Sequence, residues 1–420
     1  MKYFGTDGIR GIVDKNLSPV LIRKLARGIV NYFNINKLSR KILIGNDTRA
    51  SGEYILSIIA TILVKNNIQI DNLGCCTSPC LAYTTKKYAY PLGLMISASH
   101  NSYQYNGLKF FSTNGEKVSE EFEIMFENLM EKRINKFSNG YATVKNVEHL
   151  QQDYISKLKN LIKNRIDCLF DCANGASAKV IKQLFPKNEK MHVSPTGVNI
   201  NLNSGCTHIE QLKLHCIKKH KIGFAFDGDA DRVFAVSETG RILNGDLILF
   251  ILSKFFQTNG DYLVGTIYTN LGLEYNLKMR KIGLIRAGVG DKLVVSAMKN
   301  HGSLLGGEES GHIIIKPFTN TGDGVLTAII LSNILALSGL SLDQLISEYK
   351  ESYQLRKNLT CYANLDYSIL ADKYNNELVR VIIRKSGTEP VLRVFVESFN
   401  KNLAEQTLND ICKKLSLKTK

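Results

Sequence analysis

Short apolar runs that end at acidic residues, serine or glycine constrain the fold of this chain more than any other feature. The run at 222–226 leads directly into Asp227-Gly228-Asp229, and the run at 91–96 leads into Ser97-Ala98-Ser99. Apolar runs of about 4–8 residues between turn residues are typical of buried strands. Helical patterns, for example at 19–33, alternate with these strands. This alternation predicts α/β layers with functional loops at the strand ends.

The chain is too long for a single hydrophobic core, because its 420 residues exceed the size at which domains stop growing. A charged helical region from about 120 to 163 is interrupted at Ser138-Asn139-Gly140, which indicates the first domain boundary, and the polarity rises again after Tyr353. The similar strand-and-loop units suggest an internal structural repeat. We expect α/β domains at 1–150, 151–246 and 247–355, and a smaller unit at 356–420 with strands near 378–383 and 392–397 and a helix near 403–415.

The net charge by itself excludes little. Lys and Arg outnumber Asp and Glu by 54 to 38, which gives a formal charge of +16. Such a charge suits nucleic acid, an anionic membrane surface or a phosphorylated small molecule. The basic residues form no long run, no aromatic-basic RNA-binding signature is present, and no apolar run is long enough to span a bilayer. We therefore expect neither nucleic acid nor membrane as a partner.

Cysteine usage and the N-terminal segment favour a cytoplasmic protein. The nine cysteines are an odd number, and pairs such as Cys168 and Cys172 lack the C-x₂-C spacing of zinc sites. Buried free thiols in a reducing compartment are therefore expected. The first residues contain no apolar segment of the kind found in secretory signals.

Ser99 is the candidate nucleophile of the chain. The G-x-S-x-G elbow of acyl-transfer hydrolases is absent around it, and His100 is poorly placed as its base because adjacent residues of an extended segment point apart. A serine without a dedicated base fits a phosphoryl carrier better. Because a phosphoserine carries a charge of about −1.5 to −2 at neutral pH, this interpretation predicts a cation site and basic groups elsewhere in the chain.

Asp227, Asp229 and Asp231 form the candidate cation site. In an extended loop their carboxylates can converge on one hard cation, and Mg²⁺ is the first choice. A calcium-binding EF-hand would use Glu238 as its twelfth position, but Arg232 stands where that loop needs glycine, and strands flank it where helices belong. A solvated acidic turn is the other alternative, and it would leave three acids between buried strands with Arg232 as their only neutralising partner.

Two further loops carry groups suited to a phosphosugar. The segment 384–390 joins two strands and, with Arg393, offers two guanidiniums, two hydroxyls and a glycine-shaped backbone. This set favours a phosphate site over an ordinary basic hairpin turn. Glu308, Ser310 and His312 supply a carboxylate, a hydroxyl and an imidazole suited to vicinal sugar hydroxyls, although such loops are also common surface turns.

Four loops together resemble the signature motifs of the α-D-phosphohexomutases, in their usual order. They are Ser-His-Asn at 99–101, Asp-Gly-Asp-Ala-Asp-Arg at 227–232, Gly-Glu-Glu-Ser-Gly-His at 307–312 and Arg-Lys-Ser-Gly-Thr-Glu-Pro at 384–390. The match covers nearly the whole chain. The segment 3–11 and Val289-Gly290-Asp291 are most similar to bacterial members of the family that act on glucosamine phosphates.

The resemblance implies three related α/β domains with mixed sheets and a smaller C-terminal α+β domain around a central cleft. It implies that Ser99 is the phosphoserine and that its phosphate binds Mg²⁺ together with Asp227, Asp229 and Asp231. Residues of the other loops would bind the substrate: Glu308, Ser310 and His312 the sugar, Arg384, Ser386, Gly387, Thr388 and Arg393 the phosphate that does not react, and Arg10, His100, Lys109 and Arg232 the region of the transferring group.

The implied reaction interconverts the 6-phosphate and the 1-phosphate of glucosamine, toward amino-sugar precursors of the cell envelope. Phosphoserine donates its phosphoryl group, and a sugar bisphosphate, which also serves as primer, turns end for end before Ser99 takes a phosphoryl group back. Mannose or glucose phosphates are the alternative substrates. A hydrolase with a transient phosphoserine and a catalytically silent basic binding protein of the same fold are further alternatives. A homodimer is expected from the family.

Three departures from the family pattern bear on function. Ser102 stands where proline is usual, which frees a φ angle and restores an N–H in the nucleophile loop. Glu309 stands where relatives often carry an amide, which adds a negative charge near the sugar and leaves the substrate preference open. The chain is also somewhat short for the family, so we expect trimmed surface loops.

Overall fold

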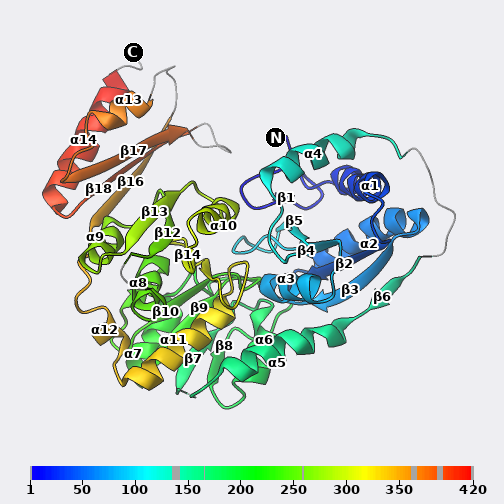
Figure 1. Ribbon diagram of the computed structural model, residues 1–420, viewed down its shortest axis with the longest axis horizontal. Coiled ribbons are helices and arrows are strands. Elements are labelled where there is room, and N and C mark those ends of the chain that lie inside the picture. Colours follow the sequence, from blue (N-terminus) through cyan, green and yellow to red (C-terminus); the bar gives the residue numbers. More distant parts are fainter. Residues whose placement is uncertain are drawn as a thin grey trace.

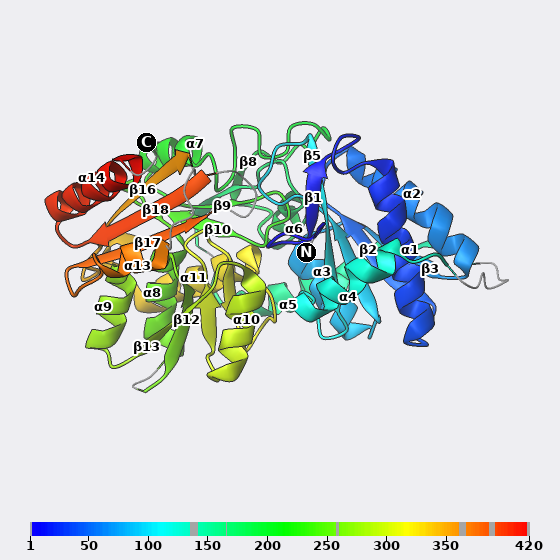
Figure 2. The same cartoon turned by 90° about the horizontal axis from the view of Figure 1, so that it is seen from above.

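The computed structural model describes residues 2–134, 142–164, 166–257, 260–360, 367–385 and 391–417. Within these residues, sheets of six, five, four and three strands follow one another along the chain. Figures 1 and 2 show the units built on the first and last sheets at opposite ends of the molecule, with the other units between them. The predicted class of α/β layers with mixed sheets and a smaller C-terminal α+β unit is confirmed. The domain limits expected at 150, 246 and 355 stay predictions.

The first sheet has the strand order β1-β5-β4-β2-β3-β6. Its strands β2, β3, β4 and β6 are parallel, whereas β5 runs antiparallel to β1 and β4. The region 120–163 is helical in α4 and α5, as expected, but it also contributes the exposed edge strand β6. The elements are β1 (Ile9–Ile12), α1 (Pro19–Ile35), β2 (Lys41–Asn46), α2 (Ser51–Leu63), η1 (Val64–Asn66), β3 (Gln69–Cys75), α3 (Ser78–Lys87), β4 (Leu92–Ile96), β5 (Tyr105–Ser112), α4 (Glu120–Glu131) and β6 (Val144–Asn146).

The second sheet has the order β11-β10-β9-β7-β8. Strands β9 and β10 are antiparallel neighbours with Phe226 opposite Val233, so the loop between them projects from the end of β9. The elements are η2 (Glu148–Leu150), α5 (Gln151–Leu161), β7 (Cys168–Asp171), α6 (Ser177–Leu184), β8 (Glu189–Met191), α7 (Glu210–Lys219), β9 (Ile222–Phe226), β10 (Val233–Val236) and β11 (Ile242–Leu243).

The third and fourth sheets have the orders β13-β12-β14-β15 and β16-β18-β17. The third unit contains α8 (Gly245–Phe256), β12 (Tyr262–Thr266), α9 (Leu271–Met279), β13 (Gly283–Ala287), α10 (Asp291–Asn300), β14 (Leu305–Gly307), β15 (Ile313–Ile315), α11 (Gly324–Ser338) and α12 (Leu342–Leu345). The last unit contains β16 (Tyr353–Thr360), α13 (Tyr367–Asp372), β17 (Val379–Lys385), β18 (Val391–Ser398) and α14 (Lys401–Leu417).

Helices α8 and α11 are apolar on nearly every face because they are core helices. Both are buried over most of their length, and the core that they help to form is continuous through the first three units. Asp323 caps the start of α11, because its carboxylate accepts from Leu326 N–H at 2.9 Å. Among the described helices, none is both long and apolar enough to cross a lipid bilayer.

Candidate active site

The backbone at Ser99 is held in an unusual conformation. Ser99 follows β4 and has a φ of +53°, in the left-handed region that costs a non-glycine residue about 1–2 kcal/mol. Its N–H donates to Ser97 Oγ at 2.9 Å, and its carbonyl oxygen accepts from Arg49 Nη2 and Asn201 Nδ2, both at 2.8 Å. These partners come from three separate segments, so the surrounding structure fixes the serine in one orientation.

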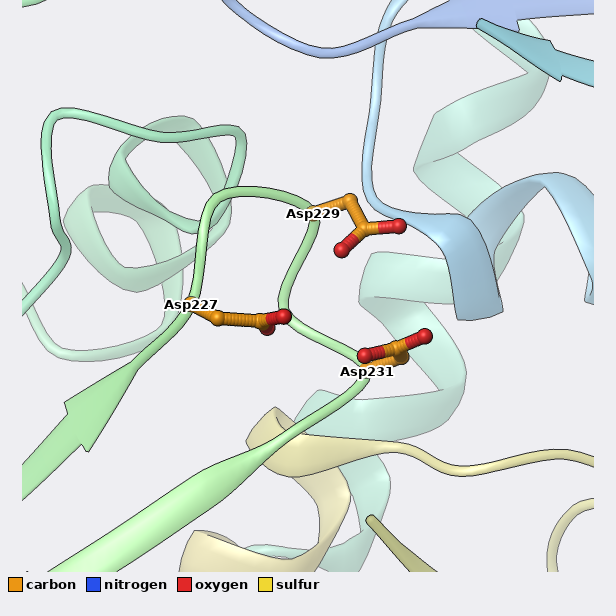
Figure 3. Close-up of side chains that lie close together, drawn as sticks. All are labelled: Asp227, Asp229 and Asp231. Carbon is orange, nitrogen blue, oxygen red and sulfur yellow. The ribbon is translucent and has the colours of Figure 1, made fainter. Parts of the chain in front are cut away.

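The carboxylates of Asp227, Asp229 and Asp231 converge at the end of β9 (Figure 3). All three residues are buried, and one oxygen from each lies within 4.8 Å of the others. Ser99 Oγ donates to Asp227 Oδ2 at 2.5 Å. The structure therefore brings together the serine and the acids that the sequence singled out. Strands flank the loop on both sides, which excludes the EF-hand alternative.

Lys109, on β5, neutralises these acids from the first sheet. Its side chain is 1% exposed, and its Nζ lies 2.7 Å from Asp229, 3.1 Å from Asp7 and 3.5 Å from Asp231. Arg232 is therefore not the only cation beside the acids, and Lys109 is one of the basic groups that the phosphoserine interpretation predicts elsewhere in the chain. The family resemblance implied that Lys109 lies near the transferring group, but no local pattern predicts that this residue of β5 contacts the loop after β9, because the two are far apart in the chain.

Lys117 is a second buried cation that sequence reasoning missed. Its Nζ lies 2.6 Å from Asp7 and 3.8 Å from Asp231, and it also pairs with Asp291. Asp7 and Asp291 had a usable signal, since they belong to the segments 3–11 and 289–291 that resemble the family. Nothing in the local sequence marks Lys117.

Burial and neighbouring charges decide the ionisation of the acids. Burial, together with the charges of Asp231 and Asp229, raises the pKa of Asp227 well above its usual range. Burial also opposes ionisation of Asp231, but the Lys109 and Lys117 ammonium groups outweigh it and hold the pKa of Asp231 well below its usual range. The cluster thus holds ionised carboxylates in a buried place, which requires nearby positive charge.

The acid cluster fits a hard cation. No described residue donates a hydrogen bond to Asp229 Oδ1 or Asp231 Oδ1, although both atoms are buried. An orphaned buried carboxylate oxygen is costly, and carboxylate oxygens are the ligands that Mg²⁺ prefers. The donor set and the unused oxygens therefore match the predicted magnesium site.

Arg10, His100 and Arg232 lie near the same serine and acids. Arg10, on β1, donates to Asp7, and His100 Nδ1 lies 3.5 Å from Ser99 Oγ, at the limit of a hydrogen bond. In an extended backbone the side chains of Ser99 and His100 would point apart, but the left-handed conformation of Ser99 brings them closer. Burial, together with the charges of Arg232 and Arg10, lowers the pKa of His100 to about 3, so its imidazole is neutral at pH 7.

The expected sugar loop lies beside the acid cluster. It connects β14 to β15, and the backbones of Arg232 and His312 form an antiparallel bridge between the two loops. His312 Nε2 lies 3.5 Å from Asp291 Oδ2. Burial raises the pKa of Glu308, and Ser310 Oγ is buried without a hydrogen-bond partner among the described residues. The loop therefore offers unused polar groups next to the candidate cation site.

Arg384 and Arg393 of the expected phosphate site are direct cross-strand neighbours on β17 and β18. Arg384 Nε donates to Tyr268 Oη at 2.6 Å, and the guanidinium lies 5.3 Å from the centre of that ring. Arg393, Tyr268 and Arg356 line a cavity of about 320 Å³ between the third and last units. The other residues expected here, Ser386, Gly387 and Thr388, lie outside the described residues.

Two departures from the family pattern have partners in the structure. Glu309 pairs with Arg356 on β16, and Arg356 lies 5.5 Å from the ring centres of Tyr268 and Phe395. The extra negative charge is thus matched by a cation of the last unit. Ser102 accepts a hydrogen bond from an arginine guanidinium through its carbonyl oxygen at 2.6 Å, so the nucleophile loop is anchored there without a proline.

Comparison with known proteins identifies the family of this chain. Family models of phosphoglucomutase/phosphomannomutase match along the chain: alpha/beta/alpha domain I at residues 1–136, alpha/beta/alpha domain III at 244–353 and the C-terminal domain at 351–414. Phosphoglucosamine mutase of Dictyoglomus turgidum is 36% identical over 434 residues, which cover 98% of this chain and 96% of that protein.

Solved structures share the fold. The crystal structure of a phosphoglucomutase/phosphomannomutase family protein from Burkholderia thailandensis matches with a TM-score of 0.81 at 18% identity and covers 98% of this chain and 97% of that one. N-acetylphosphoglucosamine mutase of Aspergillus fumigatus, in complex with GlcNAc-6P and magnesium, matches with a TM-score of 0.62 at 17% identity, over 89% and 82% of the two chains. The family models and the full-length relative carry the conclusion: this chain belongs to the phosphoglucomutase/phosphomannomutase family, the α-D-phosphohexomutases, and is an isomerase of that kind.

Proposed function

We propose that the protein interconverts glucosamine 6-phosphate and glucosamine 1-phosphate through a phosphorylated Ser99. The observation that carries this proposal is the position of the Ser99 hydroxyl, 2.5 Å from Asp227 within a buried cluster of three aspartates. The preference for glucosamine is supported by the full-length relative, which is a phosphoglucosamine mutase and shares 36% of its residues with this chain.

Asp227, Asp229 and Asp231 would hold Mg²⁺ together with the phosphate on Ser99. The support is the pair of buried carboxylate oxygens that no described residue satisfies. When bound, the cation supplies positive charge opposite the transferring phosphoryl group. Two of these acids, Asp229 and Asp231, also lie 2.7 and 3.5 Å from Lys109 Nζ, so this lysine and the cation would both balance their negative charge.

The chain's own residues position and neutralise the transferring group. The bond between phosphorus and Ser99 Oγ breaks while phosphorus bonds to the free hydroxyl oxygen of the sugar. The proton of that hydroxyl ends on Ser99 Oγ, so the products are a sugar bisphosphate and the free serine. After this intermediate turns end for end, the original phosphoryl group moves to Ser99 and completes the exchange. Such transfers depend on positioning and charge neutralisation, which the buried Lys109 and the half-buried Arg10 supply from the first sheet.

The two outer loops would hold the rest of the substrate. Glu308, Ser310 and His312 present a carboxylate, a hydroxyl and an imidazole beside the acid cluster, which suits sugar hydroxyls. Arg384 and Arg393 lie side by side on the last sheet and suit the phosphate that does not react. Three expectations stay predictions: the phosphate-binding roles of Ser386, Gly387 and Thr388, a homodimer, and a cytoplasmic location.

A mutase assay with three substrates tests the proposal. Purified enzyme with Mg²⁺ and a sugar bisphosphate primer receives glucosamine, glucose or mannose 6-phosphate, and the 1-phosphate is measured. We expect the highest kcat/KM for glucosamine 6-phosphate and almost no turnover by Ser99→Ala, which lacks the carrier oxygen. Ser102→Ala is the control in the same loop and should keep its activity. Preference for glucose or mannose phosphate would replace the substrate assignment, and a fully active Ser99→Ala would refute the carrier role.

A further inference from the structure

A second cavity, of about 340 Å³, lies apart from the serine and the acid cluster. Helix α3, helix α5, the turn at 114–115 and the loop at 316–320 form its walls, so it lies where the first, second and third units meet. Its volume is within the range of small-molecule sites, which begins at about 300 Å³. We call it the lysine cavity, after Lys86 on α3 and Lys157 on α5.

The lysine cavity carries positive charge that the described residues do not pair. Its other lysines have carboxylate partners, whereas neither Lys86 nor Lys157 forms an ion pair with a described residue. Lys157 is half-buried, and its Nζ donates to Phe318 O at 2.5 Å. Burial lowers the pKa of Lys157, and the charge of Asp323 offsets this effect only in part. The only acid among the described lining residues, Asp323, is already used by the Tyr154 hydroxyl and the start of α11.

Aromatic and apolar groups accompany this charge. Tyr83 and Phe318 are half-buried at the walls, and Pro317 is exposed beside them. Lys157 Nζ lies 5.0 Å from the centre of the Tyr83 ring. The complementary ligand carries a phosphate, which would lie beside the two lysines, and a planar ring, which would pack against the aromatic and proline side chains.

Two walls of the lysine cavity, helix α3 and the loop at 316–320, continue into the candidate active site. Helix α3 begins at Ser78, whose N–H donates to Asp229 O at 2.9 Å and whose hydroxyl donates to the Asp229 carboxylate. The loop after Phe318 leads to Gly324, whose N–H donates to Ala230 O at 3.0 Å in the acid loop. A molecule that bridges these walls would therefore act on both sides of the acid cluster.

A direct hydrogen bond also joins two walls of the cavity. Asn320 Nδ2, from the third unit, donates to Asn114 O, in the turn after β5, at 2.9 Å. Two residues after Gly115, the same turn leads to Lys117, which pairs with Asp7 and Asp291. The segment 114–117 therefore contacts the third unit at the cavity and also carries Lys117, which pairs with these two acids.

We propose that the lysine cavity is a second binding site, for a small phosphorylated ring compound of the nucleoside monophosphate class, and that its occupancy changes turnover at Ser99. The binding part of this proposal stands independently of the substrate assigned above. The effect on turnover rests on the proposed mutase function.

Lysine labelling tests the binding. Pyridoxal 5′-phosphate is a phosphorylated aromatic aldehyde that condenses with a neutral lysine amine and releases water, and borohydride then reduces the imine to a stable amine. Mass spectrometry of the labelled enzyme compares Lys86 and Lys157 with Lys159, an exposed lysine of the same helix outside the cavity. We expect at least about tenfold preference for a cavity lysine and protection by uridine or adenosine monophosphate. A smaller preference, or labelling that the nucleotides do not reduce, overturns the proposal.

Steady-state kinetics tests the coupling. With substrate saturating, so that the active site is occupied, a nucleoside monophosphate should change kcat by about fivefold or more, the lower end of typical coupling. Lys86→Gln and Lys157→Gln should remove this response, whereas the matched variant Lys159→Gln should keep it. Because Lys86 is exposed, its variant is expected to fold even where the Lys157 variant does not. If the nucleotides protect the cavity lysines from labelling but leave kcat unchanged, the coupling is overturned. If the enzyme turns over no hexose phosphate, the proposed function is contradicted while the labelling result stands.

Discussion

Replacing Lys109 with methionine tests whether a buried lysine holds the acid cluster together. Methionine keeps much of the side-chain length but removes the charge that lies 2.7 Å from Asp229 and 3.1 Å from Asp7. Because Lys109 is 1% exposed, water cannot replace it. The variant therefore leaves buried carboxylates without their nearest cation.

The structure sets the size of the effect. Removing one partner of a buried ion pair costs about 3–5 kcal/mol, because the other charge remains buried. We expect the free energy of unfolding of Lys109→Met to fall by that amount in buffer without Mg²⁺. A cation that binds only the folded state adds about 2.7 kcal/mol at a hundred times its Kd. Mg²⁺ should therefore restore more than half of the lost stability.

Denaturant unfolding with EDTA and with Mg²⁺ measures both effects. The control is Lys219→Met, which removes a lysine 2.7 Å from Glu189 in a pair whose side chains are 39% and 38% exposed. Exposed pairs contribute about 0–1 kcal/mol, so the control should stay close to the wild type and should gain no more from Mg²⁺ than the wild type does. If Lys109→Met is as stable as this control in EDTA, the reasoning about buried charge is refuted.

Four further predictions concern single side chains. Ser99→Gly should be about 1 kcal/mol more stable than Ser99→Ala, since both lose the hydroxyl but only glycine tolerates a φ of +53°; equal thermal unfolding curves would contradict this. Burial raises the pKa of Asp246 to about 7, so its contribution to stability is greatest in acid and is lost as the pH rises through 7. Asp246→Asn should therefore be up to about 4 kcal/mol more stable than the wild type at pH 8, with a smaller difference at pH 5, and a pH-independent difference in unfolding free energy would argue against it. Gly322→Ala should cost about 1–3 kcal/mol in thermal unfolding, because its Cβ would lie 2.3 Å from His312 Nε2; unchanged stability would mean that the imidazole moves freely. Glu309→Gln should change kcat/KM by no more than about fivefold, since an exposed pair contributes about 0–1 kcal/mol, and a hundredfold loss would place its carboxylate on the substrate.

The local sequence determined most helices and strands of this protein. The pattern at 19–33 became α1 (Pro19–Ile35), and the apolar run at 222–226 became β9 (Ile222–Phe226). These elements could be predicted because apolar periodicity and capping residues act over a few neighbours. Strand β6 was missed since its residues are exposed and form no apolar run, and only pairing with β3 makes it a strand.

The sequence also marked Ser99 and the aspartates, because a serine after a buried strand and alternating acids in one loop are local patterns. The family resemblance linked Ser99 to the aspartates through a shared cation, but no local pattern predicts the direct contact of 2.5 Å between Ser99 Oγ and Asp227, 128 positions away in the chain. Nor did the sequence pair Lys117 with Asp7 and Asp291, since these residues lie on separate elements. Contacts of this kind depend on how layers pack against one another, so only the tertiary structure decided how the buried charges of the site are balanced.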